Sequence, residues 1–166
     1  HSGGTFVEKN LGYKVLNLEG DTCVDFPLTA AILFSKQDII EIGMFDEDFF
    51  IYYPDLEIGR RIKDYKKSVI QIYNSKAIHQ MGKLKIRNPI KRVFFRNYFY
   101  TLDGLIFFFK KDSNLKPFYE LEKNIFRFLI TSVLSIFMFK FAKSVENFSK
   151  VLAYYKFKFF YLNKKN

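Results

Sequence analysis

The first half of the chain alternates short apolar runs with polar segments that carry helix-start signals. The apolar run 29–34 has the length of a strand. Ser35 follows it, with Asp38 three residues later in the spacing of a capping box, so we expect a helix from there to about Ile42. Gly43 stands where a glycine commonly ends a helix.

A second helix and a second strand are expected further along. The helix begins near Pro54, because Ile58, Ile62 and Tyr65 then recur on one face at the spacing i, i+4, i+7. Residues 68–73 (SVIQIY) are nearly all apolar, which is typical of a strand covered on both faces. The order strand, helix, loop, helix, strand predicts an α/β fold.

In the second half, aromatic residues lie between many basic ones. We expect a helix over residues 89–111, with proline in its first turn and lysines in its last. The apolar stretch 125–142 contains an uncharged part, 128–139, of 12 residues. A membrane span needs roughly 20 residues, so this stretch is expected to form a core or interfacial helix. The tail, 154–166, shows no clear period.

Charge divides the chain into two zones. Up to residue 82 acidic and basic groups are nearly balanced, and from Lys83 onward Lys and Arg far outnumber Asp and Glu. Glycine, asparagine and proline interrupt the periodic pattern between 82 and 89, so we place a boundary there. The net charge of +10 favours a polyanionic partner, which could be anionic lipid, nucleic acid or a phosphorylated substrate.

Cysteine and histidine are scarce. The single cysteine, Cys23, excludes an internal disulfide framework and suits a reducing compartment. Two histidines and one cysteine do not suffice for a structural zinc cluster.

Residues 45–61, FDEDFFIYYPDLEIGRR, carry a resemblance to a known family. They resemble the signature F-D-E-x-F-F-x-Y-x-E-D-x-D-L-x-x-R of family 2 glycosyltransferases, best known in rhamnosyltransferase-like members. Two acidic positions differ, since Pro54 replaces the glutamate of the E-D pair and Glu57 replaces the following aspartate. The matching positions are Phe45, Asp46, Glu47, Phe49, Phe50, Tyr52 and Asp55, and we assign the arginine of the signature to Arg60.

The flanking segments extend the resemblance to roughly residues 1–110. HSGGTF at the start, VDFPLTAAILFSKQDIIEIGMFD (24–46), KAIHQMGK (76–83) and FFRNYFY (94–100) each resemble the corresponding stretch of the family. Within 24–46, Thr29 occupies the position of a family glycine in the loop that faces the donor sugar.

The resemblance implies the C-terminal part of a GT-A, Rossmann-like glycosyltransferase domain, followed by basic, aromatic-rich helices. Residues 1–82 would be the acceptor-side part of the catalytic domain, and residues 83–166 a membrane-proximal helical extension. In the family the nucleotide-binding half and its D-x-D metal motif lie upstream. No D-x-D precedes Asp46 here, so we expect the 166-residue chain alone to bind the donor poorly and to turn over little.

Individual roles follow from the matched positions. The resemblance implies that Asp55 is the general base of an inverting transfer, since an acceptor hydroxyl must lose its proton as it attacks the anomeric carbon. It implies that His79 helps to hold a divalent metal, Mn²⁺ or Mg²⁺, together with the missing D-x-D half. The residues expected to contact acceptor or donor are Asp46, Glu47, Thr29, Glu57 and Arg60.

Structural interpretations compete with these roles. Asp55 would also serve as a helix N-cap after Pro54. A lone histidine such as His79 is commonly structural. Arg60 and Arg61 would both suit a helix surface, although we expect Arg60 to take the role of the signature arginine. The aromatic residues of the signature are expected to pack and fix the loop.

The expected function is sugar transfer from a nucleotide-sugar donor to a glycan or lipid-linked acceptor in cell-surface polysaccharide synthesis. The expected location is the inner face of the cytoplasmic membrane, bound peripherally. The alternative is a non-catalytic, degenerate chain that acts as a membrane-associated interaction module. For the basic aromatic tail three interpretations stay open: contact with an anionic membrane, packing onto the catalytic domain, and binding of nucleic acid.

Overall fold

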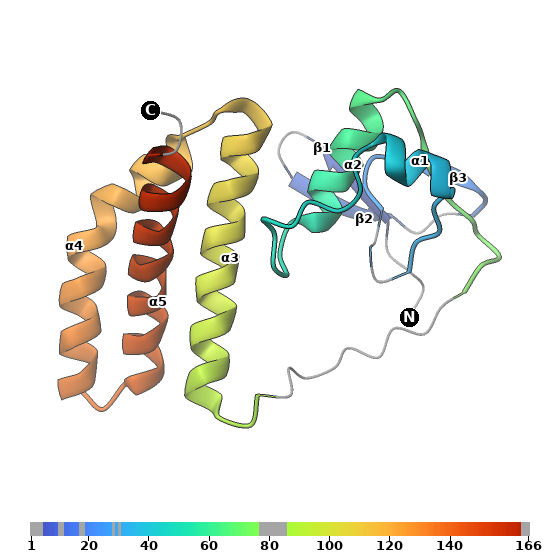
Figure 1. Cartoon of the computed structure of the whole chain (residues 1–166). Helices are drawn as coiled ribbons and strands as arrows, with labels where there is room; N and C mark the ends of the chain where they lie inside the picture. Colours follow the sequence, from blue (N-terminus) through green and yellow to red (C-terminus); the bar gives the residue numbers. More distant parts are fainter. Residues whose placement is uncertain are drawn as a thin grey trace. The chain divides into compact units, whose positions relative to one another are not determined.

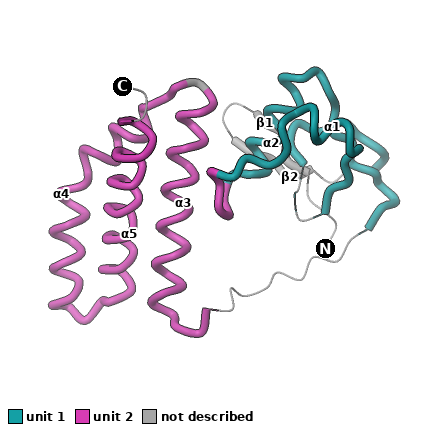
Figure 2. Tube along the Cα trace, viewed as in Figure 1, with its two compact units in different colours: residues 1–47, 53–81 teal, residues 48–52, 82–166 magenta. Residues whose placement is uncertain are grey.

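The computed structural model divides the chain into two compact units (Figure 2). Unit 1 contains residues 1–47 and 53–81, and unit 2 contains residues 48–52 and 82–166. The chain therefore leaves unit 1 after Glu47, contributes five residues to unit 2, and re-enters unit 1 at Tyr53. The residues that the structure describes are 5–9, 12–16, 19–27, 29, 31–76 and 86–163.

The strands of unit 1 form two small antiparallel pairs (Figure 1). Strand β1 (Thr5–Lys9) pairs with β2 (Gly12–Leu16), and β3 (Thr22–Val24) pairs with β4 (Val69–Gln71). In the second pair Cys23 lies opposite Ile70, and both side chains are exposed. One face of this pair is therefore open.

The predicted α/β, Rossmann-like fold is wrong. The described residues are mostly helical, and all of their paired strands are antiparallel. The strand expected at 68–73 exists as β4, but it is open on one face instead of covered on both. A strand was also expected at 29–34, but the described residues 31–34 form none. In this segment Phe34 packs on the core of unit 1, whereas Leu33 is exposed.

Two short helices complete unit 1. Helix α1 (Lys36–Glu41) begins as predicted, because the Ser35 hydroxyl accepts a hydrogen bond from the Asp38 N–H at 3.2 Å. Helix α2 (Pro54–Asp64) buries Ile58 and Ile62 as predicted, whereas Tyr65 lies beyond its end and is exposed. The core of the unit contains Ile42, Ile58 and Ile62, with Phe34, Ile39 and Val69 packed against them.

Unit 2 is helical. Its elements are α3 (Pro89–Asp112), α4 (Lys116–Phe137), α5 (Phe141–Phe157) and a π-helical turn, η1 (Lys158–Leu162). Helix α5 packs against both α3 and α4 (Figure 1). The helix predicted over 89–111 is confirmed as α3, and Asn88 caps it by accepting from the N–H groups of Ile90 and Lys91.

The apolar stretch 125–142 does not form one helix. It is divided by a turn at Phe139, whose φ of 56° is left-handed, and α5 begins two residues later. Among the helices that the structure describes, none combines the length and the hydropathy that crossing a bilayer requires.

The core of unit 2 is centred on Phe157, which contacts the rings of Phe109 and Phe118 at centroid distances of 5.6 Å. Phe157→Ala should lower the free energy of unfolding by about 3–5 kcal/mol, since its side chain is 0 % exposed. The matched control is Phe159→Ala, whose ring is 59 % exposed and which should change stability by no more than about 0.5 kcal/mol. Urea denaturation followed by helical circular dichroism measures both, and equal midpoints would contradict this core.

Candidate functional site

Asp55 is the second residue of α2. Tyr53, in the left-handed region with φ of 68°, is the N-cap, and its carbonyl accepts from the N–H groups of Leu56 and Glu57 at 3.1 and 2.9 Å. Pro54 occupies the first helical position, which suits a residue that has no N–H to donate. The interpretation of Asp55 as the N-cap is therefore wrong. Its carboxylate still lies in the first turn, where the helix dipole favours negative charge.

Thr29 and Asp55, 26 residues apart, meet in unit 1. The Thr29 backbone N–H donates to Asp55 Oδ1 at 3.2 Å, and the Thr29 hydroxyl donates to the same oxygen. No hydrogen-bond partner of Oδ2 is found in the described part of the chain. Thr29 thus holds one of the two carboxylate oxygens.

Gly59 brings α2 close enough for this contact. It lies one turn after Asp55 on the same helical face. A Cβ added at Gly59 would lie 2.5 Å from Phe26 Cδ1, 3.0 Å from the Asp25 carbonyl oxygen and 3.1 Å from Phe26 Cα. The helix therefore rests on the backbone of residues 25–26, three residues before Thr29. A glycine inside a helix costs about 1 kcal/mol relative to alanine, and this cost is the signal that could have identified Gly59 from the sequence.

Glu57 is held by arginine within the fold. Its carboxylate is 3 % exposed and receives two bonds from Arg61, Nε to Oε1 at 2.7 Å and Nη2 to Oε2 at 2.8 Å. Arg61 also donates Nη1 to the carbonyl of Ile42, and so joins α2 to the end of α1. Arg60 lies 3.4 Å from Glu57 and 3.8 Å from Asp64, and its side chain is partly exposed. Counted from Phe45, the arginine position of the signature falls on Arg61, so its assignment to Arg60 is wrong. In this geometry Glu57 serves the fold by holding the Arg61 side chain. The ligand roles predicted for Glu57 and Arg60 stay predictions.

Asp46 and Glu47 lie in unit 1 just before the chain enters unit 2. Asp46 is half-buried and Glu47 is exposed. Their predicted contact with the acceptor stays a prediction.

The signature aromatics of residues 48–52 pack within unit 2. Phe49 is buried, Phe50 stacks on Phe99 with ring centroids 4.0 Å apart, and Tyr52 meets Tyr100 edge to face at 5.4 Å. Their packing within the unit agrees with the expectation that these rings fix the loop.

Asp103, on α3, binds the backbone of the same segment. Its carboxylate is fully buried, and Oδ2 accepts from the N–H groups of Ile51 at 3.0 Å and Tyr52 at 2.8 Å. Oδ1 is buried and has no hydrogen-bond partner in the parts of the chain described. Burial raises the pKa of Asp103, while the backbone N–H groups of residues 50–52 oppose this rise. Sequence reasoning missed Asp103, although an aspartate in the run YTLDGLIFFF is itself a signal for a buried, bound carboxylate.

A metal site is not formed by the residues described. His79 lies outside them, so its predicted role as a ligand stays a prediction. Within the described ranges no three His, Cys, Asp or Glu side chains form a group that could hold a metal ion. We derive no step through a divalent metal.

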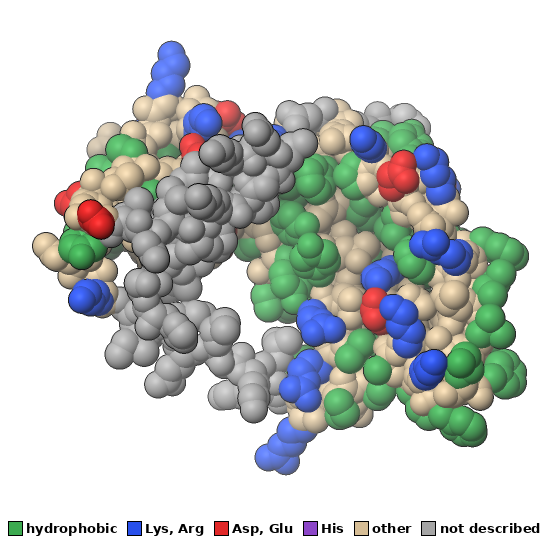
Figure 3. Space-filling model, turned by 180° about the vertical axis from the view of Figure 1, so that it is seen from behind, with side chains coloured by type: hydrophobic (Ala, Val, Ile, Leu, Met, Phe, Trp, Pro, Cys, Tyr) green, Lys and Arg blue, Asp and Glu red, His purple; other side chains and the backbone are tan. Residues whose placement is uncertain are grey.

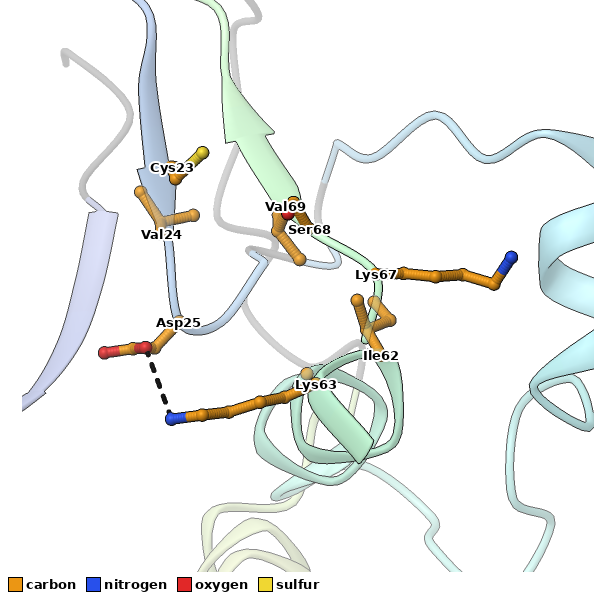
Figure 4. A pocket seen from close by; sticks show the side chains of 9 residues that line it. Cys23, Val24, Asp25, Ile62, Lys63, Lys67, Ser68 and Val69 are labelled. Carbon is orange, nitrogen blue, oxygen red and sulfur yellow. Dashed lines mark ion pairs between the residues drawn. The ribbon is translucent and has the colours of Figure 1, made fainter. Parts of the chain in front are cut away.

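A shallow hollow opens between β3, α2 and β4 (Figure 4). Cys23 and Val69 lie on its strands, and Lys67 extends away to one side. Lys63 points to Asp25, with 3.8 Å between its Nζ and Asp25 Oδ1. Asp55 does not line this hollow, which is distinct from the candidate site.

Comparison with known proteins identifies no similar protein. No family model matches the chain, and no curated protein or solved structure is significantly similar to it. The functional assignment therefore rests on the signature residues and on the geometry around Asp55.

Replacing Gly59 tests the close approach of α2. Gly59→Ala should destabilise unit 1 by about 1–3 kcal/mol, because backbone atoms of residues 25–26 must move to admit the methyl group. Gly20→Ala is the control, since a Cβ there meets nothing within 4 Å. Chemical denaturation of both variants checks this. A Gly59→Ala protein more stable than wild type, as helix propensity alone predicts, would contradict the packing.

Asp103 should make stability depend on pH. A folded-state pKa above the unfolded value stabilises the fold below the ordinary aspartate pKa of about 4, and this stabilisation is lost as pH rises through the folded pKa. Asp103→Asn removes the titration. Urea titrations at several pH values give the free energy of unfolding of both proteins. The value for wild type minus the value for the variant should decrease from acid to neutral pH. A difference that increases would show that the backbone hydrogen bonds outweigh burial.

Proposed function

We propose that this chain takes part in transferring a sugar from a nucleotide-sugar donor to a glycan or lipid-linked acceptor, with Asp55 as the general base. The supporting observation is the contact between Thr29 and Asp55. The resemblance places both residues at the reaction site from separate segments, and in the fold one hydrogen-bonds to the other.

The chemistry needs one available carboxylate oxygen. The acceptor hydroxyl gives its proton to Asp55 Oδ2 while its oxygen forms the new bond to the anomeric carbon. The bond from that carbon to the nucleoside diphosphate breaks on the opposite side, and the configuration inverts. Thr29 holds Oδ1, so the carboxylate keeps its orientation during the transfer.

A second candidate is a non-catalytic module at the membrane. It is favoured by the loss of acidic groups around Asp55, since Pro54 replaces one of them and Arg61 binds Glu57. In either case we propose a peripheral location at the inner face of the cytoplasmic membrane. This location is supported by the excess of Lys and Arg after residue 82 and, for the first candidate, by the use of a nucleotide-sugar donor.

The two candidates differ in their response to Asp55→Asn. In the full-length gene product, which would include any donor-binding segment, this change should lower the rate of sugar transfer by about 10²–10⁴-fold. Asp64→Asn, at the exposed end of the same helix, is the control and should retain the rate. The measurement is transfer or hydrolysis of the labelled donor, with circular dichroism to show that both variants fold. Equal rates for wild type and Asp55→Asn would exclude Asp55 as the base and favour the non-catalytic module.

A further inference from the structure

Helices α4 and α5 meet through polar side chains. The Ser132 hydroxyl donates to the Ser144 carbonyl at 2.9 Å and lies 3.0 Å from the Ser144 hydroxyl. The Asn147 amide donates to the Thr131 hydroxyl at 2.9 Å. The buried polar residues of the two helices are Ser132, Ser135, Ser144, Asn147 and Ser149. Small and hydroxyl-bearing residues of this kind are typical of helix contacts inside lipid.

The outward side of α4 is apolar. Phe126 and Phe137 are 74 % and 77 % exposed, and the face repeats at i, i+4, i+7, i+8 and i+11. We define the α4 apolar face as Phe126, Ile130, Val133, Leu134 and Phe137, all of them exposed. We define the hairpin tip as Met138, Phe139 and Phe141, where Phe139 is 82 % exposed. In Figure 3 hydrophobic side chains gather along the outer edge and lower end of unit 2.

In the half of the hairpin nearest the turn, residues 126–147, the polarity is therefore inverted relative to a water-exposed helix pair. There Ser132 and Ser144 bond to each other inside, and the large side chains of the α4 apolar face point outward. At the other end of the hairpin Phe118 and Phe157 form an ordinary apolar core. Burial against water-excluding material would remove this exposed apolar surface from water, which is the main driving force for association.

Basic residues flank the apolar face in the sequence. From residue 123 to residue 145 the chain contains four basic residues and no Asp or Glu. Lys123 and Lys143 form ion pairs with Glu120 and Glu146, which lie just outside this range, at 3.0 and 3.2 Å. The charges of Arg127, near the start of α4, and Lys140, at the turn, are complementary to an anionic surface.

We propose that the α4 apolar face and the hairpin tip insert into the interfacial layer of an anionic lipid bilayer. The uncharged part of the hairpin, 12 residues, is too short to span the hydrocarbon core and suits a helix that lies in the interface. The inverted polarity and the basic border both favour lipid over nucleic acid, which would need basic and aromatic groups on one polar surface. This surface extends the membrane location proposed above and does not depend on sugar transfer.

The test uses the full chain and vesicles of phosphatidylcholine, with or without phosphatidylglycerol. The variant Phe137→Gln/Phe139→Asn removes two exposed rings and keeps the backbone, since asparagine tolerates the left-handed φ of 56° at residue 139. Its partitioning to anionic vesicles should fall at least about tenfold, because two side chains no longer bury apolar surface. The matched control is Phe159→Gln/Phe160→Asn, which removes two exposed rings from the 154–166 tail. It should bind as wild type does, because the proposal assigns the lipid contact to the hairpin and not to the tail.

A fluorescent reporter locates the insertion. The chain has no tryptophan, so Phe137→Trp gives a single probe. Its emission should shift to the blue with anionic vesicles, much less with neutral ones, and less at high salt. Phe159→Trp should not shift.

Four results would overturn the proposal. The first two are equal vesicle binding by both double variants, and unchanged emission of the Phe137→Trp variant when vesicles are added. The third is a dimer that forms without lipid and that Phe137→Gln/Phe139→Asn dissociates. The fourth is RNA binding that the same double variant loses. Asp55→Asn should bind vesicles like wild type, so failure of the catalytic assignment is distinguishable from failure of this surface.

Discussion

The organisation of unit 1 depends on the approach of α2 to the backbone of residues 25–26 at Gly59. Any side chain at that position would meet Phe26, so the absence of a Cβ sets the distance between helix and loop. One consequence is that Thr29, three residues after Phe26, reaches Asp55 in the first turn of the helix. On a neighbouring face of α2, Arg61 donates to the Ile42 carbonyl at the end of α1, and Glu57 holds the Arg61 guanidinium.

In unit 2 the buried carboxylate of Asp103 fixes the position of a backbone segment, as the close approach at Gly59 does in unit 1. Asp103 binds the N–H groups of Ile51 and Tyr52, which recovers part of the cost of removing its charge from water. The chain between Asp48 and Asp55 is thus constrained at two places, by Asp103 within unit 2 and by Thr29 within unit 1. The family-like signature coincides with this doubly constrained segment. Phe49 and Tyr52 serve packing there, and Asp55 is the acidic member that Thr29 holds.

The sequence predicted what local signals determine. The capping serine of α1, the proline that opens α2 and the length of α3 were all expected and confirmed. Sheet type was not predictable, because an apolar run such as 68–73 has the same composition in a covered parallel strand and in a half-open antiparallel one. Gly59 and Asp103 were missed because their partners lie far away along the chain, at residues 25–26 and 51–52. Thr29 and Asp55 were each predicted from the resemblance, but their hydrogen bond required the fold.

The claim that Thr29 acts through Asp55 is tested most directly by a double-mutant cycle on the rate of sugar transfer by the full-length gene product. The variants are Thr29→Val, Asp55→Asn and the pair, since valine keeps the shape and the backbone N–H of Thr29 but removes its hydroxyl. Thr29→Val should slow sugar transfer when Asp55 is present and have no further effect once Asp55 is asparagine. Rate losses that multiply in the double variant would show that the two residues act independently, and would contradict this account of the site.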